Sequence, residues 1–313
     1  PAPIDFNIEL QLPEPYTPTI APDEYRCFLL PWPEDEDSYI TALSVTPGNR
    51  QIVHHVIVFA VPPEKVADFE ALDAADPDPG YLCYGGPTGG SAVDNAAQTP
   101  WLGSWVPGDF GTMPEGTGLL MRPGSRIIVQ MHYHSYPGAG SDQSRIRIRT
   151  AESVDRVAVV MPFTNPAWVM NTQPMLIPAG DADVVHAFEA DIGNFLGLLF
   201  PPGVYKAGDP FVVHSALVHL HTRGVSGTLG VVGSQDTCLL DIPRWDFNWQ
   251  GSYTLAEPVT VSPGDKLRIE CRWDNSKANQ PFENGMQQDP VDIYWGEGTG
   301  DEMCLGILYV TAK

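Results

Sequence analysis

Residues 210–233 read PFVVHSALVHLHTRGVSGTLGVVG, and this stretch decides the fold class. Two apolar, β-branched runs, 211–220 and 228–232, flank a glycine-containing turn, which is the pattern of neighbouring strands. The 31 prolines and 30 glycines interrupt the whole chain at intervals of about ten residues, a rhythm typical of β-sandwiches. We therefore predict an all-β protein with further strands at 145–149, 157–161 and 306–310.

Only residues 62–74, PPEKVADFEALDA, read as a helix, with proline in the first turn. The segment 75–100 that follows contains Asp-Pro pairs and the pairs Gly85-Gly86 and Gly89-Gly90, so we expect a loop there. At 313 residues the chain is long enough for two domains. We place the boundary between the charged run RIRIR and the apolar run RVAVV, giving domains 1–151 and 152–313.

Charge limits the classes of partner. Lys and Arg number 17 against 39 Asp and Glu, a net charge of −22. Nucleic acids and anionic membranes are polyanions, so we predict neither as a partner. The apolar run FLGLLF at 195–200 is too short for a membrane helix. The chain begins at Pro1, which leaves open whether a signal peptide was removed or the chain was trimmed.

Four strings carry nitrogen and sulfur donors, and three of them lie in strand-like runs. Those three are QIVHHVIVF with His54 and His55, IIVQMHYHSY with His132, and ALVHLHTRG with His219 and His221. His-X-His on a strand points both rings to one face. The adjacent pair His54-His55 points to opposite faces, so one metal would need different ring nitrogens or a β-bulge. The alternative is one core and one exposed histidine.

The fourth string, GEGTGDEMC, adds the thioether of Met303. Imidazole together with methionine sulfur is a ligand preference of copper, since neutral nitrogen serves both oxidation states and sulfur favours Cu(I). Zinc, calcium and magnesium seldom bind methionine. The donor types therefore predict redox copper, whereas the alternative for Met303 is one more core methionine.

Taken together, these strings resemble the copper type II, ascorbate-dependent monooxygenases, the family of peptidylglycine α-hydroxylating monooxygenase and dopamine β-monooxygenase. The resemblance spans nearly the whole chain. It implies two eight-stranded antiparallel jelly-roll domains with one copper each, facing a cleft, so we expect two coppers per chain. The sites implied are an electron-supplying site of His54, His55 and His132, and a catalytic, oxygen-binding site of His219, His221 and Met303.

Two residues near His132 are candidates for supporting that copper. Gln130 matches a glutamine that family members carry near this site, so a hydrogen-bonding role beside the ligands is plausible. His134 stands where the family usually has glycine or a small residue. It could add a ligand or a supporting hydrogen bond, but we favour a polar residue at the cleft edge.

The resemblance also implies the disulfides Cys27–Cys83 and Cys271–Cys304, each within one domain. Cys238 is left without a partner, and its apolar neighbours Leu239 and Leu240 suit a buried thiol. Structural disulfides form in oxidising compartments, so we predict a secreted or periplasmic protein.

The family pattern predicts the activity, and departures from it bear on the substrate. The expectation is a copper monooxygenase that uses O2 and ascorbate or a similar reductant to hydroxylate an activated C–H of a small molecule. Peptide-amidating members carry an arginine where this chain has Leu217, and asparagine and tyrosine where it has Leu305 and Ile307. A peptide carboxylate would lack a counter-charge, so peptidylglycine is a poor substrate. The alternative is a non-catalytic copper-binding protein on the same fold.

Overall fold

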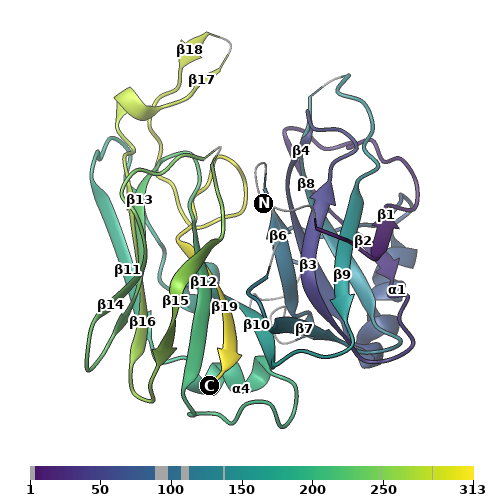
Figure 1. Cartoon of the computed structure of the whole chain (residues 1–313). Coiled ribbons are helices and arrows are strands. Elements are labelled where there is room, and N and C mark those ends of the chain that lie inside the picture. The colour runs from purple at the N-terminus through teal and green to yellow at the C-terminus, as the bar shows by residue number, and fades with distance from the viewer. Residues whose placement is uncertain (1–3, 89–97, 107–112, 137, 248, 284) are drawn as a thin grey trace. The chain divides into compact units, whose positions relative to one another are not determined.

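A computed structural model describes residues 4–88, 98–106, 113–136, 138–247, 249–283 and 285–313. The described chain is mostly β-strand with few helices, which confirms the all-β prediction (Figure 1). It divides into two compact units. Unit 1 is Pro1–Met161 with Leu198–Lys206 and Val310–Ala312, and unit 2 is Pro162–Gly197, Ala207–Tyr309 and Lys313. The boundary expected between 151 and 152 and the jelly-roll topology stay predictions.

Unit 1 is built on strands in the order β1-β9-β3-β7-β10-β6-β4-β8-β2-β5. Neighbours such as β2 and β8 are antiparallel, whereas β7 and β10 run parallel. The elements up to β10 are β1 Ile8–Gln11, β2 Asp23–Pro31, β3 Ser38–Thr46, β4 Val53–Val61, η1 Pro63–Lys65, α1 Val66–Ala75, β5 Tyr81–Leu82, β6 Trp101–Trp105, β7 Thr117–Met121, β8 Arg126–His134, β9 Arg145–Ala151 and β10 Arg156–Phe163.

Strand β8 is the central strand for the first histidine group. Its sequence RIIVQMHYH is buried from Ile127 to Tyr133, and β2 and β4 flank it on either side. The register places His132 between Tyr25 of β2 and His55 of β4. Distant segments of the sequence thus supply the neighbours of His132.

The helix expected at 62–74 is present as the short η1 and α1, and α1 lies against β2 and β5 (Figure 1). Phe69 of α1 packs in a buried cluster with Tyr81 and the disulfide Cys27–Cys83. The loop expected at 75–100 contains the short strand β5, and its residues 89–97, with Gly89-Gly90, lie outside the described residues.

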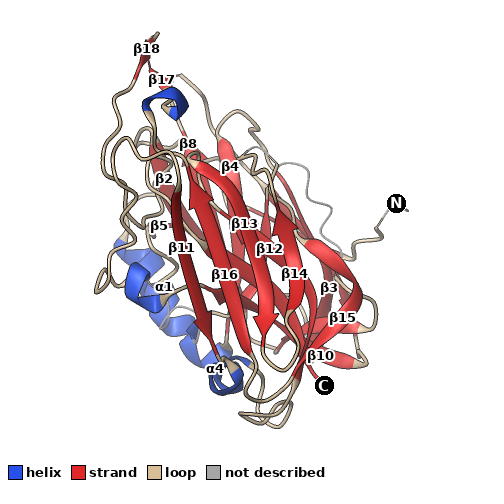
Figure 2. Cartoon of the chain, turned by 90° about the vertical axis from the view of Figure 1, so that its left-hand side faces the viewer, coloured by secondary structure: helices blue, strands red, loops and turns tan. Residues whose placement is uncertain are grey.

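Unit 2 contains two sheets. The first is the four-stranded sheet β11-β16-β13-β14, seen face-on in Figure 2, and the second is the short pair β17-β18; β12 pairs with β15 and β19, which the strand pairing assigns to the 13-stranded sheet. A Cβ on Gly227 of β13 would lie 2.5 Å from Val218 of β12, so glycine permits the close packing of these two strands. The bounds are β11 Val184–Ala190, β12 Phe211–His219, β13 Gly224–Val232, β14 Thr237–Ile242, β15 Tyr253–Val261, β16 Lys266–Trp273, η2 Lys277–Asn279, β17 Phe282–Glu283, β18 Met286–Gln287 and β19 Leu305–Ala312.

The expectation of a single helix is wrong, since α3 (Pro166–Val169) and α4 (Gly193–Leu199) are helices as well. Asn165 caps α3 by accepting a hydrogen bond from the N–H of Ala167, and Pro166 opens the helix. Asp191 accepts one from the N–H of Gly193 at the start of α4. Capping residues, rather than a long periodic pattern, mark these short helices. None of the described helices is long and apolar enough to cross a membrane.

Candidate metal centres

The first group of histidines lies where strand β4 has a bulge. In the pairing of β4 with β8, Val53 is opposite Tyr133 and His55 is opposite His132, so His54 is an extra residue. A bulge breaks the strict alternation of side chains. From the sequence, His54 and His55 could bind one metal either through different ring nitrogens or because of a β-bulge. The structure contains the bulge.

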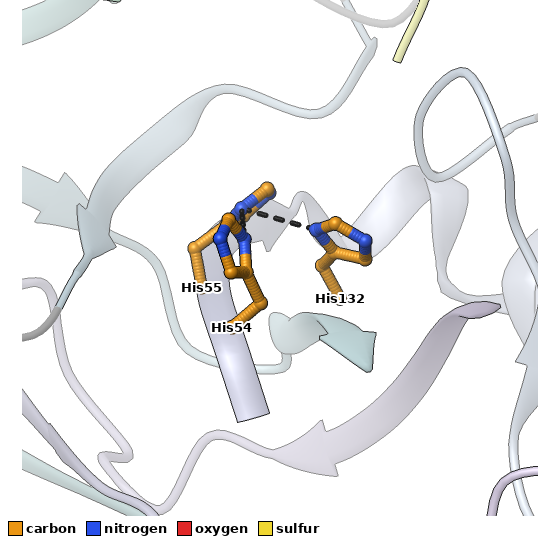
Figure 3. A group of neighbouring side chains, drawn as sticks. All are labelled: His54, His55 and His132. Carbon is orange, nitrogen blue, oxygen red and sulfur yellow. Dashed lines mark hydrogen bonds between the residues drawn. The ribbon is translucent and has the colours of Figure 1, made fainter. Parts of the chain in front are cut away.

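The Nδ1 atoms of the three histidines face one another (Figure 3). Nδ1 of His55 lies 3.2 Å from Nδ1 of His54 and 3.3 Å from Nδ1 of His132. Two nitrogens that are each about 2.0 Å from one metal, at a near-tetrahedral angle, lie about 3.3 Å apart. The three side chains are therefore arranged to fit one metal ion with little movement.

The surroundings of His132 keep its ring buried and oriented. The ring stacks on Tyr25, with centroids 4.2 Å apart and planes 10° from parallel, and its exposed fraction is 2%. Burial lowers the pKa of the His132 imidazole, and the Asp23 carboxylate opposes that shift. Nε2 of His132 lies 3.0 Å from Oδ1 of Asp23. A neutral imidazole is the form that binds a metal.

Gln130 and His134 differ in what they contact. The Gln130 amide is buried and donates a hydrogen bond of 3.0 Å to the carbonyl of Cys83, which ties β8 to the disulfide-bonded loop. His134 is exposed, and its Nδ1 lies 3.0 Å from Oδ1 of Asp23, the same oxygen that faces His132. Neither residue belongs to the three-histidine group. A role for them toward a metal stays a prediction.

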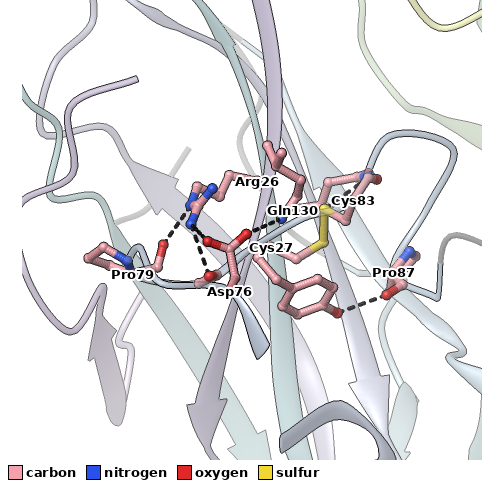
Figure 4. The surroundings of a disulfide bond; sticks show 10 residues. Arg26, Cys27, Asp76, Pro79, Cys83, Pro87 and Gln130 are labelled. Carbon is pink, nitrogen blue, oxygen red and sulfur yellow. Dashed lines mark hydrogen bonds and ion pairs between the residues drawn. A yellow bond between two sulfur atoms is a disulfide. The ribbon is translucent and has the colours of Figure 1, made fainter. Parts of the chain in front are cut away.

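The disulfide Cys27–Cys83 fixes the loop that follows α1 (Figure 4). Close to it, the buried Arg26 forms an ion pair of 2.8 Å with Asp76 and donates hydrogen bonds to the carbonyls of Pro79 and Gly80. The Tyr81 hydroxyl donates one of 2.8 Å to the carbonyl of Pro87. The predicted pairing of Cys27 with Cys83 is confirmed. Because Cys27 belongs to β2, the disulfide anchors this strand beside the three histidines.

The second group lies in unit 2 at the end of β12. The strand ends at His219, so the expectation that one strand carries both His219 and His221 is wrong. The two rings are nevertheless adjacent, with centroids 5.0 Å apart. The residues after His219 leave the sheet because the Glu302 carboxylate binds their backbone N–H groups, 2.8 Å from His221 and 2.6 Å from Arg223.

These contacts also bring the Met303 string to the histidines. Nδ1 of His221 lies 3.0 Å from the carbonyl oxygen of Asp301. Glu302 is fully buried and accepts a third hydrogen bond from Nε1 of Trp273. Burial raises the pKa of the Glu302 carboxyl to about 7, against the effect of the N–H donors, which lower it. The half-buried Met303 thus follows two residues that are hydrogen-bonded to the His221 segment.

The disulfide Cys271–Cys304 is confirmed and holds the chain immediately after Met303. Cys238 forms no disulfide, as predicted, but it is exposed, which contradicts the expectation of a buried thiol. In the pairing of β13 with β14, Leu229 is opposite Leu240 and Gly230 is opposite Cys238, so Leu239 is an extra residue. The irregularity buries both leucines and turns Cys238 outward.

Sequence reasoning missed Asp23, Glu302 as an anchor, and Gln250. Oε1 of Gln250 lies 2.5 Å from Nδ1 of His219, and the Gln250 amide donates to the carbonyl of Phe247. In the same loop, Trp245 donates from Nε1 to the carbonyl of His221. The only sequence signal for this loop is its aromatic density, WDFNW at 245–249, of which residue 248 lies outside the described part of the chain.

Comparison with known proteins shows similarity over most of the chain. Residues 208–311, which include His219, His221 and Met303, match the profile of "Copper type II ascorbate-dependent monooxygenase, C-terminal domain". The human "Putative DBH-like monooxygenase protein 2" is 24% identical over 91% of this chain and 52% of its own length. The mouse "DBH-like monooxygenase protein 1" is 25% identical over 83% of this chain and 39% of its own length.

A third relative, "Peptidyl-glycine alpha-amidating monooxygenase A" of Xenopus laevis, is 23% identical over 99% of this chain and 28% of its own length. The chain is thus similar to copper type II, ascorbate-dependent monooxygenases over most of its length, and residues 208–311 match the C-terminal domain of that family. It spans about half or less of the length of these curated relatives. Among solved structures, the major capsid protein P2 of bacteriophage PM2 aligns with a TM-score of only 0.31 and 11% identity over 98% of both chains.

Proposed function

We propose that this protein is a copper- and ascorbate-dependent monooxygenase that hydroxylates an activated C–H of a small organic substrate. The observation that carries the proposal is the convergence of the Nδ1 atoms of His54, His55 and His132 at separations of 3.2 and 3.3 Å. Such spacing fits one metal, and it occurs in a chain that is similar to a copper-dependent family.

In unit 1, His54, His55 and His132 would hold the copper that supplies an electron. The bulge at His54 turns adjacent side chains toward one point, and burial keeps the His132 ring neutral. Three imidazoles without a carboxylate form a neutral ligand set, which suits a metal that changes between Cu(I) and Cu(II). The task of the chain here is to hold three nitrogens in place through both states.

In unit 2, His219, His221 and Met303 would hold the copper at which oxygen is activated. Nδ1 of His219 faces Gln250 and Nδ1 of His221 faces the Asp301 carbonyl, so the ligand atoms proposed are the two Nε2 atoms. Copper reduced by ascorbate supplies the redox chemistry. Met303 provides the sulfur donor that favours Cu(I), and a set of three protein ligands leaves a position for O2.

The substrate is proposed to be a neutral or amine-bearing, partly apolar small molecule. Leu217, two residues before His219, is buried and apolar, and Leu305 and Ile307 follow Met303. An anionic group would find no charge-assisted hydrogen bond from these side chains. The net charge of −22 favours a cation weakly. A peptidylglycine is therefore disfavoured.

The two disulfides support a secreted or periplasmic location, because cytosolic thiols are kept reduced. The packing of β12 on β13 in unit 2 supports the jelly-roll topology proposed for the second domain.

The test is oxygen consumption by the copper-loaded protein with ascorbate, during a screen of amines, phenethyl compounds and hydrophobic acyl-glycines. We expect oxygen consumption to rise in the presence of one substrate class. The amount of oxygenated product should equal the amount of O2 consumed. A His219→Ala variant is the control for uncoupled oxidation of ascorbate by loosely bound copper. Stoichiometric copper without any product would favour the non-catalytic copper-binding protein instead.

A further inference from the structure

We propose that Asp23 is a positioning residue that fixes the orientation and tautomer of His132, and that His134 holds Asp23 in this role. The inference rests on the proposed three-histidine copper site. It concerns Asp23 and His134, two residues outside the three-histidine group.

The Asp23 carboxylate is placed by strand register. β2 begins at Asp23, which is opposite His134, and two residues later Tyr25 is opposite His132. Side chains two apart on a strand share a face, so Asp23 lies beside both His132 and His134. Its Oδ1 is 3.0 Å from Nε2 of His132 and 3.0 Å from Nδ1 of His134.

The contact with Asp23 determines which nitrogen of His132 carries the proton. An ionised carboxylate only accepts hydrogen bonds, and a neutral imidazole has one N–H and one lone pair. Nε2 of His132 must therefore be the donor to Asp23. The lone pair then lies on Nδ1, the atom 3.3 Å from Nδ1 of His55 and directed to the centre of the group. Asp23 thus selects the tautomer that a metal at this centre requires.

His134 contributes from the solvent side. The exposed fraction of the side chains rises from 2% at His132 through 17% at Asp23 to 51% at His134. Nδ1 of His134 adds a second donor to Oδ1 of Asp23, the oxygen that also faces His132. This donor favours the orientation of the carboxylate in which Oδ1 faces His132.

A carboxylate on the distal nitrogen also makes the imidazole a more basic ligand, and loss of such a partner typically weakens metal binding by about 10- to 100-fold. The effect is larger for Cu(II) than for Cu(I), because the more highly charged ion gains more from a basic ligand. A tenfold selective loss of Cu(II) affinity would raise the one-electron potential by about 59 mV.

The first experiment compares Cu(II) affinity and reduction potential of the three-histidine site in full-length Asp23→Asn and the unsubstituted chain, both with His221→Ala to disable the second site. The matched control is Asp76→Asn, a carboxylate of unit 1 with the same 17% exposure that pairs with Arg26 and contacts no histidine. We expect at least tenfold weaker Cu(II) binding and a higher potential for Asp23→Asn, and neither change for Asp76→Asn. Equal values for Asp23→Asn and its parent overturn the role of Asp23 while leaving the copper site intact.

The second measurement needs no substitution at Asp23. In the copper-free full-length protein labelled with ¹⁵N-histidine, NMR should report His132 protonated on Nε2 and not on Nδ1. The opposite tautomer overturns the inference even if Asp23→Asn does not fold. If the unsubstituted chain binds no copper through His54, His55 and His132, the proposed function fails, and the role of Asp23 fails with it.

Discussion

The backbone N–H of His221 donates a hydrogen bond of 2.8 Å to the buried carboxylate of Glu302. This contact joins two segments that are 81 residues apart, and Met303 comes directly after Glu302. Because Cys304 is bonded to Cys271, the methionine lies between two fixed neighbours. Glu302 is therefore the structural link between the proposed nitrogen and sulfur ligands of unit 2.

From this link we predict that Glu302→Gln destabilises the protein and loosens the second copper. The amide has one accepting oxygen, whereas the carboxylate accepts from His221, Arg223 and Trp273. One or more buried donors would lose a partner, at a cost of about 1–3 kcal/mol each. Urea unfolding and copper analysis measure both effects. Glu270→Gln, at an exposed ion pair, should change stability by less than about 1 kcal/mol, and an equal change in the two variants would refute the argument.

The sequence could predict the strands, because period-two patterns are local. It could also predict the candidate ligands and the cysteine pairs, because these follow from short motifs and from the resemblance to the family. It left the geometry of His54 and His55 open, and pairing with β8 decided it. Asp23 could not be found this way, since its closeness to His132 depends on register between segments 109 residues apart. Cys238 was misjudged because one extra residue in β14 reverses which side chains face outward.

Exposure of Cys238 predicts that the folded protein reacts with one equivalent of a thiol reagent. The other four cysteines are buried in disulfides and should not react without reductant. Mass spectrometry of peptides from the labelled, unreduced protein would locate the modification, and Cys238→Ser provides the blank. Labelling that requires denaturant would show that the thiol is buried after all.

Removal of the Cys27–Cys83 bridge should lower the free energy of unfolding by about 2–5 kcal/mol, the usual range for native disulfides of secreted proteins. The bridge closes a loop with a sequence separation of 56, and Gln130 binds the carbonyl of Cys83 next to His132. The Cys27→Ala/Cys83→Ala variant should therefore also bind less copper at the three histidines. Denaturation curves that coincide with those of the unsubstituted protein would contradict the first expectation.

His132→Ala should remove one of two coppers. The variant loses the Nδ1 that lies 3.3 Å from that of His55, and two imidazoles alone hold a metal weakly. Metal analysis should fall from two coppers per chain to one, and the Cu(I) X-ray absorption spectrum should keep the sulfur scattering assigned to Met303. His186→Ala is a useful control for the first group, because His186 lies in unit 2 and its ring binds the carbonyl of Leu176. One copper in the unsubstituted protein, or tightly bound zinc instead, would rule out two copper sites.

Met303→Leu gives opposite outcomes for a structural and a ligating methionine. Leucine has nearly the same volume, and Met303 is only half-buried, so the change should cost less than about 1.5 kcal/mol of stability. Glu302 and Cys304 retain their own bonds, so the backbone at this position should not move. If Met303 is only a packing residue, oxygen consumption and product yield should persist. If it binds the oxygen-activating copper, the substitution removes the sulfur donor while keeping the fold, and turnover should collapse as it would in His219→Ala. These outcomes are separated by measuring thermal unfolding and ascorbate-dependent product formation on the same preparation. Wild-type turnover in Met303→Leu would refute the assignment of this residue as a ligand.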